Sequence, residues 1–171
     1  RQTKLAMGHA VALDKSDPYI QLANHIGRSS TILEAGGMEE RAASLGAKST
    51  AIVVQRVLLR FVRGACEGRS FQENNLSQVA VPNLTSQSRR GLQTKLEDFI
   101  GGFAAAMGPE EFKNRDSLHL SAPGWQVLGL VFHDMIFTLR DRVTAQMYTD
   151  MVARLAAIDW SRYNPAWIGM I

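Results

Sequence analysis

Apolar residues that recur every three or four positions constrain the fold of this chain more than any other feature. They form two runs, which comprise Val54, Val57, Leu58, Phe61, Val62 and Ala65, and then Leu92, Leu96, Phe99, Ile100, Phe103 and Ala104. This spacing places the apolar side chains on one face of an α-helix. The first predicted helix ends near Gly68. The second runs from Thr85 or Ser86 to about Met107, where Gly108-Pro109 stops it.

Three more helices are indicated. Asp17-Pro18 predicts a helix to about Ile26, because aspartate accepts hydrogen bonds from the first amides and proline fits the first turn. Ser121-Ala122-Pro123 predicts a second helix, which reaches about Leu139. Apolar residues at helical spacing predict a third over 143–157.

Strand signals are sparse. The run at 51–54 could form a short strand or begin the following helix. Residues 27–48 predict a loop with at most a helical piece at 38–44, residues 69–83 another loop, and residues 1–16 an irregular arm. We therefore expect a mainly α fold, a single-domain helical bundle over 1–171 with at most a short strand near 51–54.

Composition excludes several classes of protein. Hydrophobic residues make up 46% of the chain and charged residues 20%, which is typical of a globular domain. No apolar run approaches the roughly 20 residues that span a bilayer, so we expect no membrane partner. Cys66 is the only cysteine, which precludes an internal disulfide and favours the reducing cytoplasm. We interpret Cys66 as a small buried hydrophobe.

Positive charge is concentrated in the first part of the chain. The net charge is +3 overall, +6 over residues 1–95 and −3 over residues 96–171. Arg56, Arg60 and Arg63 fall within about 60° of one another on the predicted helix, opposite its apolar face. Two interpretations stay open: the arginines form a solvated helix face, or their guanidinium groups contact phosphate.

Four other cations extend the candidate phosphate-binding set. Arg89 and Arg90 lie near a helix start, where the helix dipole disfavours positive charge, so they hint at an external anion. Lys4 and Lys15 in the arm could also reach a phosphate backbone. The basic half of the chain is therefore where we expect an anionic partner to bind.

Patterns typical of catalysis and of metal or cofactor binding do not occur. The histidines lack zinc-site spacing, and the chain has no phosphate-binding loop and no GxSxG elbow. We therefore predict no catalytic residue, no metal and no cofactor, and an enzyme is disfavoured. An enzymatic alternative would need His119, Asp116 or His133 to converge in a cleft. Otherwise His119 is expected to make a structural hydrogen bond and His133 to lie in the core or an interface.

The last fourteen residues are rich in aromatic side chains. Chain ends fray unless they are tied down, and large aromatic rings are stabilised by burial. We therefore expect residues 158–171 to form a docked tail, with anchors at Asp159, Trp160, Arg162, Tyr163 and Trp167. Asp159 and Arg162 suggest a buried ion pair packed against indole.

The tail also carries a family resemblance. The run from Leu155 to Asn164, followed by Trp167 and Gly169, resembles the C-terminal signature of DndB-like, DGQHR-domain proteins of bacterial DNA phosphorothioation (DNA sulfur modification) systems. Three further stretches, 3–18, 48–57 and 118–129, agree with this family in order. The Asp-Gly-Gln-His-Arg motif is absent, so the chain looks like the region downstream of it, the C-terminal part of a larger protein.

The resemblance implies a DNA-associated role in transcription regulation. Together with the charge pattern, it leads us to predict a regulatory or accessory protein that binds DNA phosphates through the seven basic residues named above and contacts other DNA-modification proteins. A homo-oligomer is compatible with this role. The alternative is a protein–protein interaction module that recruits those proteins without touching DNA. Its mark would be an exposed apolar patch, either at Met135-Ile136-Phe137 or on the 147–151 face.

Overall fold

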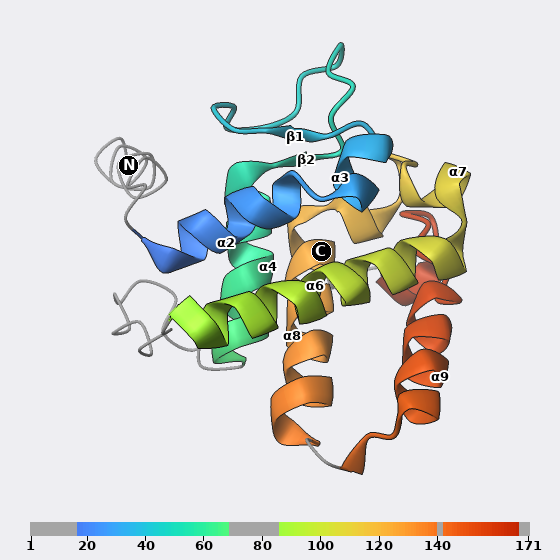
Figure 1. Cartoon of the computed structure of the whole chain (residues 1–171). Coiled ribbons are helices and arrows are strands. Elements are labelled where there is room, and N and C mark those ends of the chain that lie inside the picture. The colour runs from blue at the N-terminus through green and yellow to red at the C-terminus, as the bar shows by residue number, and fades with distance from the viewer. Residues whose placement is uncertain (1–16, 69–85, 140–141, 168–171) are drawn as a thin grey trace.

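The computed structural model describes residues 17–68, 86–139 and 142–167, which are mostly helical, so the expected mainly α fold is confirmed (Figure 1). The elements are α2 (Pro18–Gly27), α3 (Ser30–Glu34), β1 (Met38–Glu39), β2 (Val53–Val54), α4 (Gln55–Glu67), α6 (Ser86–Met107), α7 (Pro109–Phe112), η1 (Leu118–Leu120), α8 (Ala122–His133), η2 (Asp134–Thr138), α9 (Ala145–Ala156) and η4 (Pro165–Trp167). The predicted arm at 1–16, the loop at 69–83 and the last residues of the tail lie outside the described ranges.

Side-chain caps begin α2 and α8 where the sequence predicts them. The Asp17 carboxylate accepts from the amides of Tyr19 and Ile20, at 2.7 Å and 3.3 Å. The Ser121 hydroxyl accepts from the Gly124 amide at 3.1 Å and begins α8. Each cap satisfies amides that have no partner within the helix, which fixes where the helix starts.

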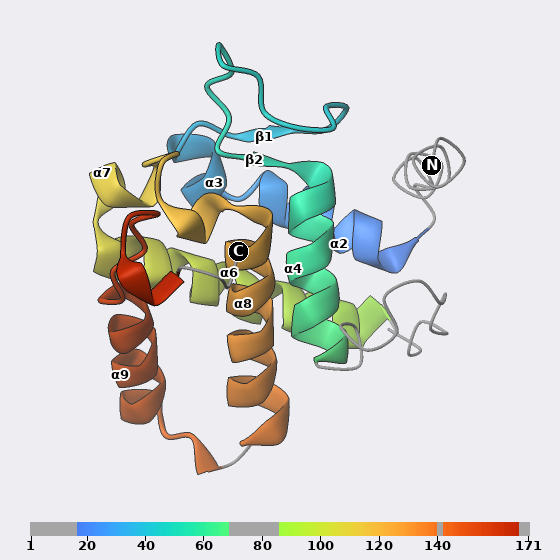
Figure 2. The same ribbon diagram turned by 180° about the vertical axis from the view of Figure 1, so that it is seen from behind.

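The helices α4 and α8 form the centre of the core and pack side by side (Figures 1 and 2). Glycine makes their approach close: a Cβ atom at Gly129 would overlap the carbonyl oxygen of Phe61, and one at Gly64 would lie 3.5 Å from the carbonyl oxygen of Gln126. The Phe61 and Trp125 rings meet edge to face beside this crossing, with centroids 5.4 Å apart. α4 is therefore held rigidly along one side.

In Figure 1 the long helix α6 passes in front of α4 and α8, and it packs against α2 and α9 and covers the core with its apolar face. Leu96, Phe99 and Phe103 are fully buried. Gly101-Gly102 could have marked a break or close packing. The helix continues through the pair, and a Cβ atom at Gly102 would lie 3.6 Å from Val152 of α9. The pair therefore does not break the helix, and a methyl group at Gly102 would make only an ordinary contact.

Residues 27–48 differ from the prediction in two places. The helix lies at Ser30–Glu34, not at 38–44, and Met38–Glu39 instead pairs in parallel with Val53–Val54. Gly36 and Gly37 explain the change, because their φ angles of +126° and +91° end α3 and turn the chain toward β2. The short strand expected near 51–54 is present, and α4 follows it directly.

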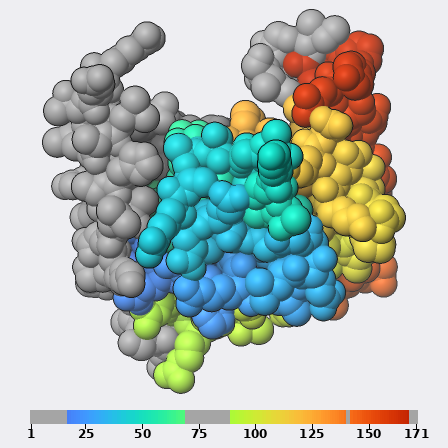
Figure 3. Space-filling model, turned by 90° about the horizontal axis from the view of Figure 1, so that it is seen from above, coloured from blue at the N-terminus to red at the C-terminus, as the bar shows by residue number. Residues whose placement is uncertain are grey.

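The loop between the two strands rests on the segment that precedes η1. Seen from above, the β1–β2 region (blue to cyan) lies beside residues 108–118 (yellow), with the tail (red) at the far edge (Figure 3). Arg115 joins the two segments, because its guanidinium donates to the carbonyl oxygens of Ser49 and Gly46 at 2.8 Å and 3.2 Å. No sequence pattern pointed to this residue.

The α8 helix ends earlier than its sequence predicts. Regular α-helix stops at His133, and a π-helical turn continues it through Thr138, with the Leu139 amide donating to the carbonyl oxygen of Asp134 at 2.9 Å. Such i→i+5 turns are rare and usually short. Within the described ranges, no helix is both long and apolar enough to cross a membrane.

Candidate nucleic-acid interface

The outward face of α4 carries the arginines that the sequence singled out. Leu58, Phe61 and Ala65 on the opposite face are fully buried, so the contacts of α4 with α8 and α2 fix which side points outward. Figure 2 shows α4 and α8 next to each other on the side turned to the viewer. A cation on this face is therefore presented from a rigid backbone rather than from a loop.

Arg56 and Arg60 are exposed and lie one helical turn apart on this face. Neither forms an ion pair or side-chain hydrogen bond with any residue that the structure describes. Guanidinium groups stay charged and offer paired donors that match phosphate oxygens. These two side chains are the available cations of the predicted stripe.

Arg63 is placed differently from the other two. Its Nε and Nη2 donate to the two carboxylate oxygens of Glu67, each at 3.2 Å, and its guanidinium carbon lies 5.9 Å from the Tyr19 ring centre. The Arg63 side chain is 27% exposed. The stripe was predicted as three equivalent cations, but one of them is compensated by a carboxylate four residues later on the same face.

The cations at the start of α6 form a separate group. Arg89 donates to the side-chain oxygen of Gln21 on α2, and Arg90 is exposed. Tyr19 and Gln21 project about 200° apart on α2 at 100° per residue, so Arg63 and Arg89 contact different sides of that helix. Lys4 and Lys15 lie outside the described ranges.

Two weakly acidic groups lie beside the Arg63–Glu67 pair. Burial, followed by the nearby Glu67 carboxylate, raises the pKa of Tyr19 and raises that of the half-buried Cys66 to about 12. Both groups are therefore neutral at physiological pH. A protonated thiol is a poor nucleophile and a poor metal ligand, which fits the predicted packing role of Cys66.

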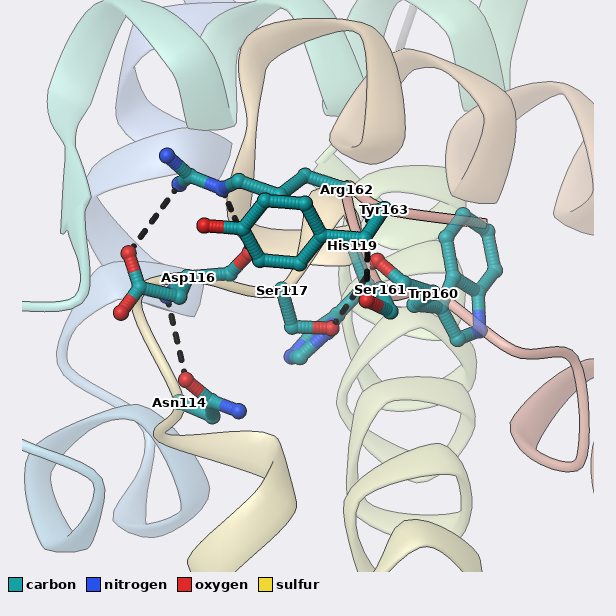
Figure 4. Close-up of polar contacts among 8 residues, drawn as sticks. All are labelled: Asn114, Asp116, Ser117, His119, Trp160, Ser161, Arg162 and Tyr163. Atoms are coloured by element: carbon teal, nitrogen blue, oxygen red, sulfur yellow. Dashed lines mark hydrogen bonds and ion pairs between the residues drawn. The ribbon is translucent and has the colours of Figure 1, made fainter. Parts of the chain in front are cut away.

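The aromatic tail docks against η1 (Figure 4). The Leu118 amide donates to the carbonyl oxygen of Trp160 at 2.7 Å, and the Trp160 ring is 4% exposed. Trp167 stacks on Trp160 with ring centroids 5.6 Å apart, and its Nε1 donates to the carbonyl oxygen of Asp159 at 2.9 Å. The two tryptophans hold residues 158–167 onto the body of the protein.

Three of the expected tail anchors are placed differently from the prediction. Arg162 pairs with Asp116 at 3.3 Å and also donates to its carbonyl oxygen at 3.0 Å, so the expected ion pair with Asp159 is wrong. Asp159 instead accepts from the Ser161 amide at 2.9 Å. Tyr163 is 85% exposed, so its ring does not anchor the tail. The turn that Asp159 begins directs this ring outward.

His119 lies fully buried beneath the tail. Its Nε2 is 2.9 Å from the carbonyl oxygen of Phe112, and its Nδ1 is 2.8 Å from the Ser117 hydroxyl. A carbonyl only accepts, so Nε2 carries the proton and the Ser117 hydroxyl donates to Nδ1. Burial lowers the pKa of His119, which keeps the ring neutral. The serine–histidine pair is sealed from solvent, so the expected structural hydrogen bond describes it better than catalysis does.

The residues that an enzyme would need do not converge. The Asp116 side chain is 84% exposed at the surface, and His133 bonds through Nδ1 to the carbonyl oxygen of Ala65 at 3.0 Å. His133 thus lies at the α4–α8 interface, while His119 lies under the tail. Across the described part of the chain, no three histidine, cysteine or acidic side chains gather where they could hold a metal ion.

One further hollow lies between α3 and α6. It has a volume of about 450 Å³ and is lined by hydroxyl groups and acidic side chains, namely those of Ser29, Ser30, Thr31, Glu97 and Asp98. Its acidic lining repels phosphate, so it is no candidate for binding DNA.

No protein-family model matches the chain, and no curated protein or solved structure is significantly similar to it. The resemblance to DndB-like proteins therefore stays a prediction.

Proposed function

We propose that the chain is a DNA-associated regulatory or accessory protein of a bacterial DNA sulfur-modification system, and that it binds DNA phosphates through the outward face of α4. The setting comes from the resemblance of the tail to DndB-like proteins. The observation that carries the binding proposal is the exposure of Arg56 and Arg60, one turn apart and without an acidic partner among the described residues.

The chemistry of this face suits a polyanion without reading its sequence. Phosphate contacts fix position and orientation, whereas base edges specify sequence. Two arginines neutralise at most two phosphates each time the helix docks, and each phosphate contact contributes a slope of about 0.9 to the dependence of log affinity on log salt. We therefore propose weak, salt-dependent and sequence-independent binding by this region.

The test replaces both arginines in the R56A/R60A variant and measures binding to a fluorescent duplex at 50 mM and 200 mM salt. DNA affinity falls between 50 mM and 200 mM salt. Because two phosphate contacts are lost, this fall should be about 12-fold smaller in R56A/R60A than in the unmodified chain. The matched control is R142A/R154A, which removes two exposed arginines near α9, on the other side of the molecule in Figure 1. Equal effects of the two double variants would reject the α4 face as the DNA-binding surface.

The alternative is a protein–protein interaction module, and one observation favours it. Val127, Phe137 and Met147 are 41%, 38% and 45% exposed, although Met135, which the sequence placed in the same patch as Phe137, is buried. This alternative predicts that M147S and F137S weaken binding to other modification proteins. It is favoured if the unmodified chain shows no salt-dependent binding to the duplex.

A further inference from the structure

The His119 ring is enclosed by aromatic side chains, and both of its nitrogens are bonded. Its Nε2–H donates to the carbonyl oxygen of Phe112 at 2.9 Å, and its Nδ1 accepts from the Ser117 hydroxyl at 2.8 Å (Figure 4). The rings of Phe103, Phe112 and Trp160 have centroids 5.9, 5.8 and 6.3 Å from that of the imidazole. Aromatic carbon covers the ring, so this environment suits a neutral imidazole better than a charged one.

The hydrogen bonds around His119 can accommodate a second ring proton, but the surrounding charges do not compensate it. With Nδ1 protonated, the Ser117 hydroxyl would turn its own proton to the carbonyl oxygen of Trp160, 3.4 Å away. The positive charge is the costly part. Glu111 on α7 attracts the proton, but burial outweighs that attraction and lowers the pKa of His119.

The charged groups on the neighbouring segments are engaged elsewhere. Asp116, which precedes η1, pairs with Arg162 of the tail at 3.3 Å. Asp159 accepts from an amide of its own turn at 2.9 Å. The α6 helix contributes the uncharged ring of Phe103. A charged His119 is therefore stabilised mainly by solvent, and solvent reaches it only when one of the covering segments moves.

The tail is the covering segment that can move without taking an acceptor from the charged ring. Movement of α7 would remove the Phe112 carbonyl, which accepts from Nε2 in both protonation states, and the attraction of Glu111. Phe103 is fixed within the 22-residue helix α6. Trp160, by contrast, is the only buried residue in the stretch 157–167. Lifting of the tail therefore admits solvent at the lowest structural cost.

From this arrangement we infer that residues 158–167 form a proton-sensitive cover, which lifts from η1 when His119 takes up a proton. The lifted state separates Arg162 from Asp116 and uncovers the aromatic rings around the histidine. The inference goes beyond the proposed function, because it concerns the tail and not the α4 face. It holds whether or not the chain binds DNA.

Proton linkage sets the direction and size of the effect. Burial keeps His119 neutral in the docked state, whereas a solvated imidazole has a pKa of about 6.5. The docked state is therefore favoured fully above that pH and loses this advantage as the pH falls. Between pH 8 and pH 5, the population of the lifted state relative to the docked state should rise by up to about 30-fold.

Native-state hydrogen exchange of the unmodified chain tests the inference. The Leu118 amide reports on the tail, because it donates to the carbonyl oxygen of Trp160 at 2.7 Å, and the Leu128 amide in the middle of α8 reports on the core. At pH 8, Leu118 should be less protected than Leu128. Low urea should hardly change its protection, since a local opening exposes little surface. At pH 5 its protection, corrected for the intrinsic exchange rate, should be lower by up to about 30-fold.

Two results of this experiment would overturn the inference. Equal protection of Leu118 and Leu128, with the same dependence on urea, would mean that the tail opens only when the whole protein unfolds. Constant protection of Leu118 from pH 8 to pH 5 would mean that lifting of the tail does not depend on a proton.

Two histidine variants identify the group that takes up the proton. H119Q should abolish the pH dependence of Leu118 protection, whereas H25Q, which replaces an exposed histidine, should keep it. A dependence that persists in H119Q, or that is lost in H25Q, would reject His119 as the group. The exchange data for the unmodified chain test the inference even if H119Q does not fold.

Discussion

The His119 ring stacks on the ring of Phe112, with centroids 5.8 Å apart, and its Nε2 bonds to the carbonyl oxygen of the same residue at 2.9 Å. This double contact joins α7 to the turn that opens α8. The Trp160 ring lies 6.3 Å from the same imidazole, edge to face. A single neutral histidine therefore connects α7 and η1, which are close in sequence, with the distant tail.

Stability should fall as the pH is lowered because of this histidine. Burial lowers the pKa of His119 in the folded state, so the unfolded chain binds the proton more readily. The contribution is fully present above the unfolded pKa of about 6.5 and is lost as the pH falls toward the folded pKa. Urea midpoints at pH 8, 7, 6 and 5 measure this. The H119Q variant should be less stable than the unmodified chain at pH 8, but its stability should change less with pH. The H25Q variant, which replaces an exposed histidine, should keep the pH dependence of the unmodified chain. A parallel decline in H119Q and the unmodified chain would contradict the assignment of this pH dependence to His119.

Two aromatic residues of the tail should differ sharply when they are truncated. Trp160 is buried and Trp167 stacks on it, so W160A should reduce the free energy of unfolding by about 3–5 kcal/mol. Tyr163 is 85% exposed, so Y163A should change it by no more than about 0.5 kcal/mol. Thermal or urea denaturation of both variants checks this. Comparable losses would mean that the Tyr163 ring packs against the protein.

The sequence predicted those parts of the fold that local chemistry decides. Asp17 and Ser121 identified two helix starts, because a capping side chain acts on amides two or three residues away. The ending of α3 and the pairing of Met38 with Val53 depend on segments fifteen residues apart, which no local pattern encodes.

The candidate site shows the same division. The helical spacing placed Arg56 and Arg60 correctly on the outward face of α4. It also contained the information that Glu67 follows Arg63 by one turn, and that signal could have been used. By contrast, the partner of Arg162 was unpredictable, because Asp116 lies far away in sequence and meets it only once the tail docks.

Two helical glycines should respond in opposite directions to alanine. Gly129 allows α8 to approach α4, and a Cβ atom there would overlap the Phe61 carbonyl oxygen, so G129A should destabilise the fold by about 1–3 kcal/mol. Gly91 of α6 is exposed, and a Cβ atom there would meet no other atom within 4 Å, so G91A should stabilise by up to about 1 kcal/mol. Denaturant midpoints report both. A neutral G129A would show that the two helices can separate without cost.

The arginines of α4 should divide into one that supports the fold and two that do not. Arg56 and Arg60 are exposed, so R56A and R60A should each alter the free energy of unfolding by no more than about 0.5 kcal/mol. R63A removes the counter-charge of a carboxylate that is 3% exposed, and should cost up to about 3 kcal/mol. R63A/E67Q should recover most of this loss, because the neutral amide needs no counter-charge. Urea denaturation of the four variants measures the difference, and an R63A variant as stable as R56A would mean that water already compensates the Glu67 carboxylate.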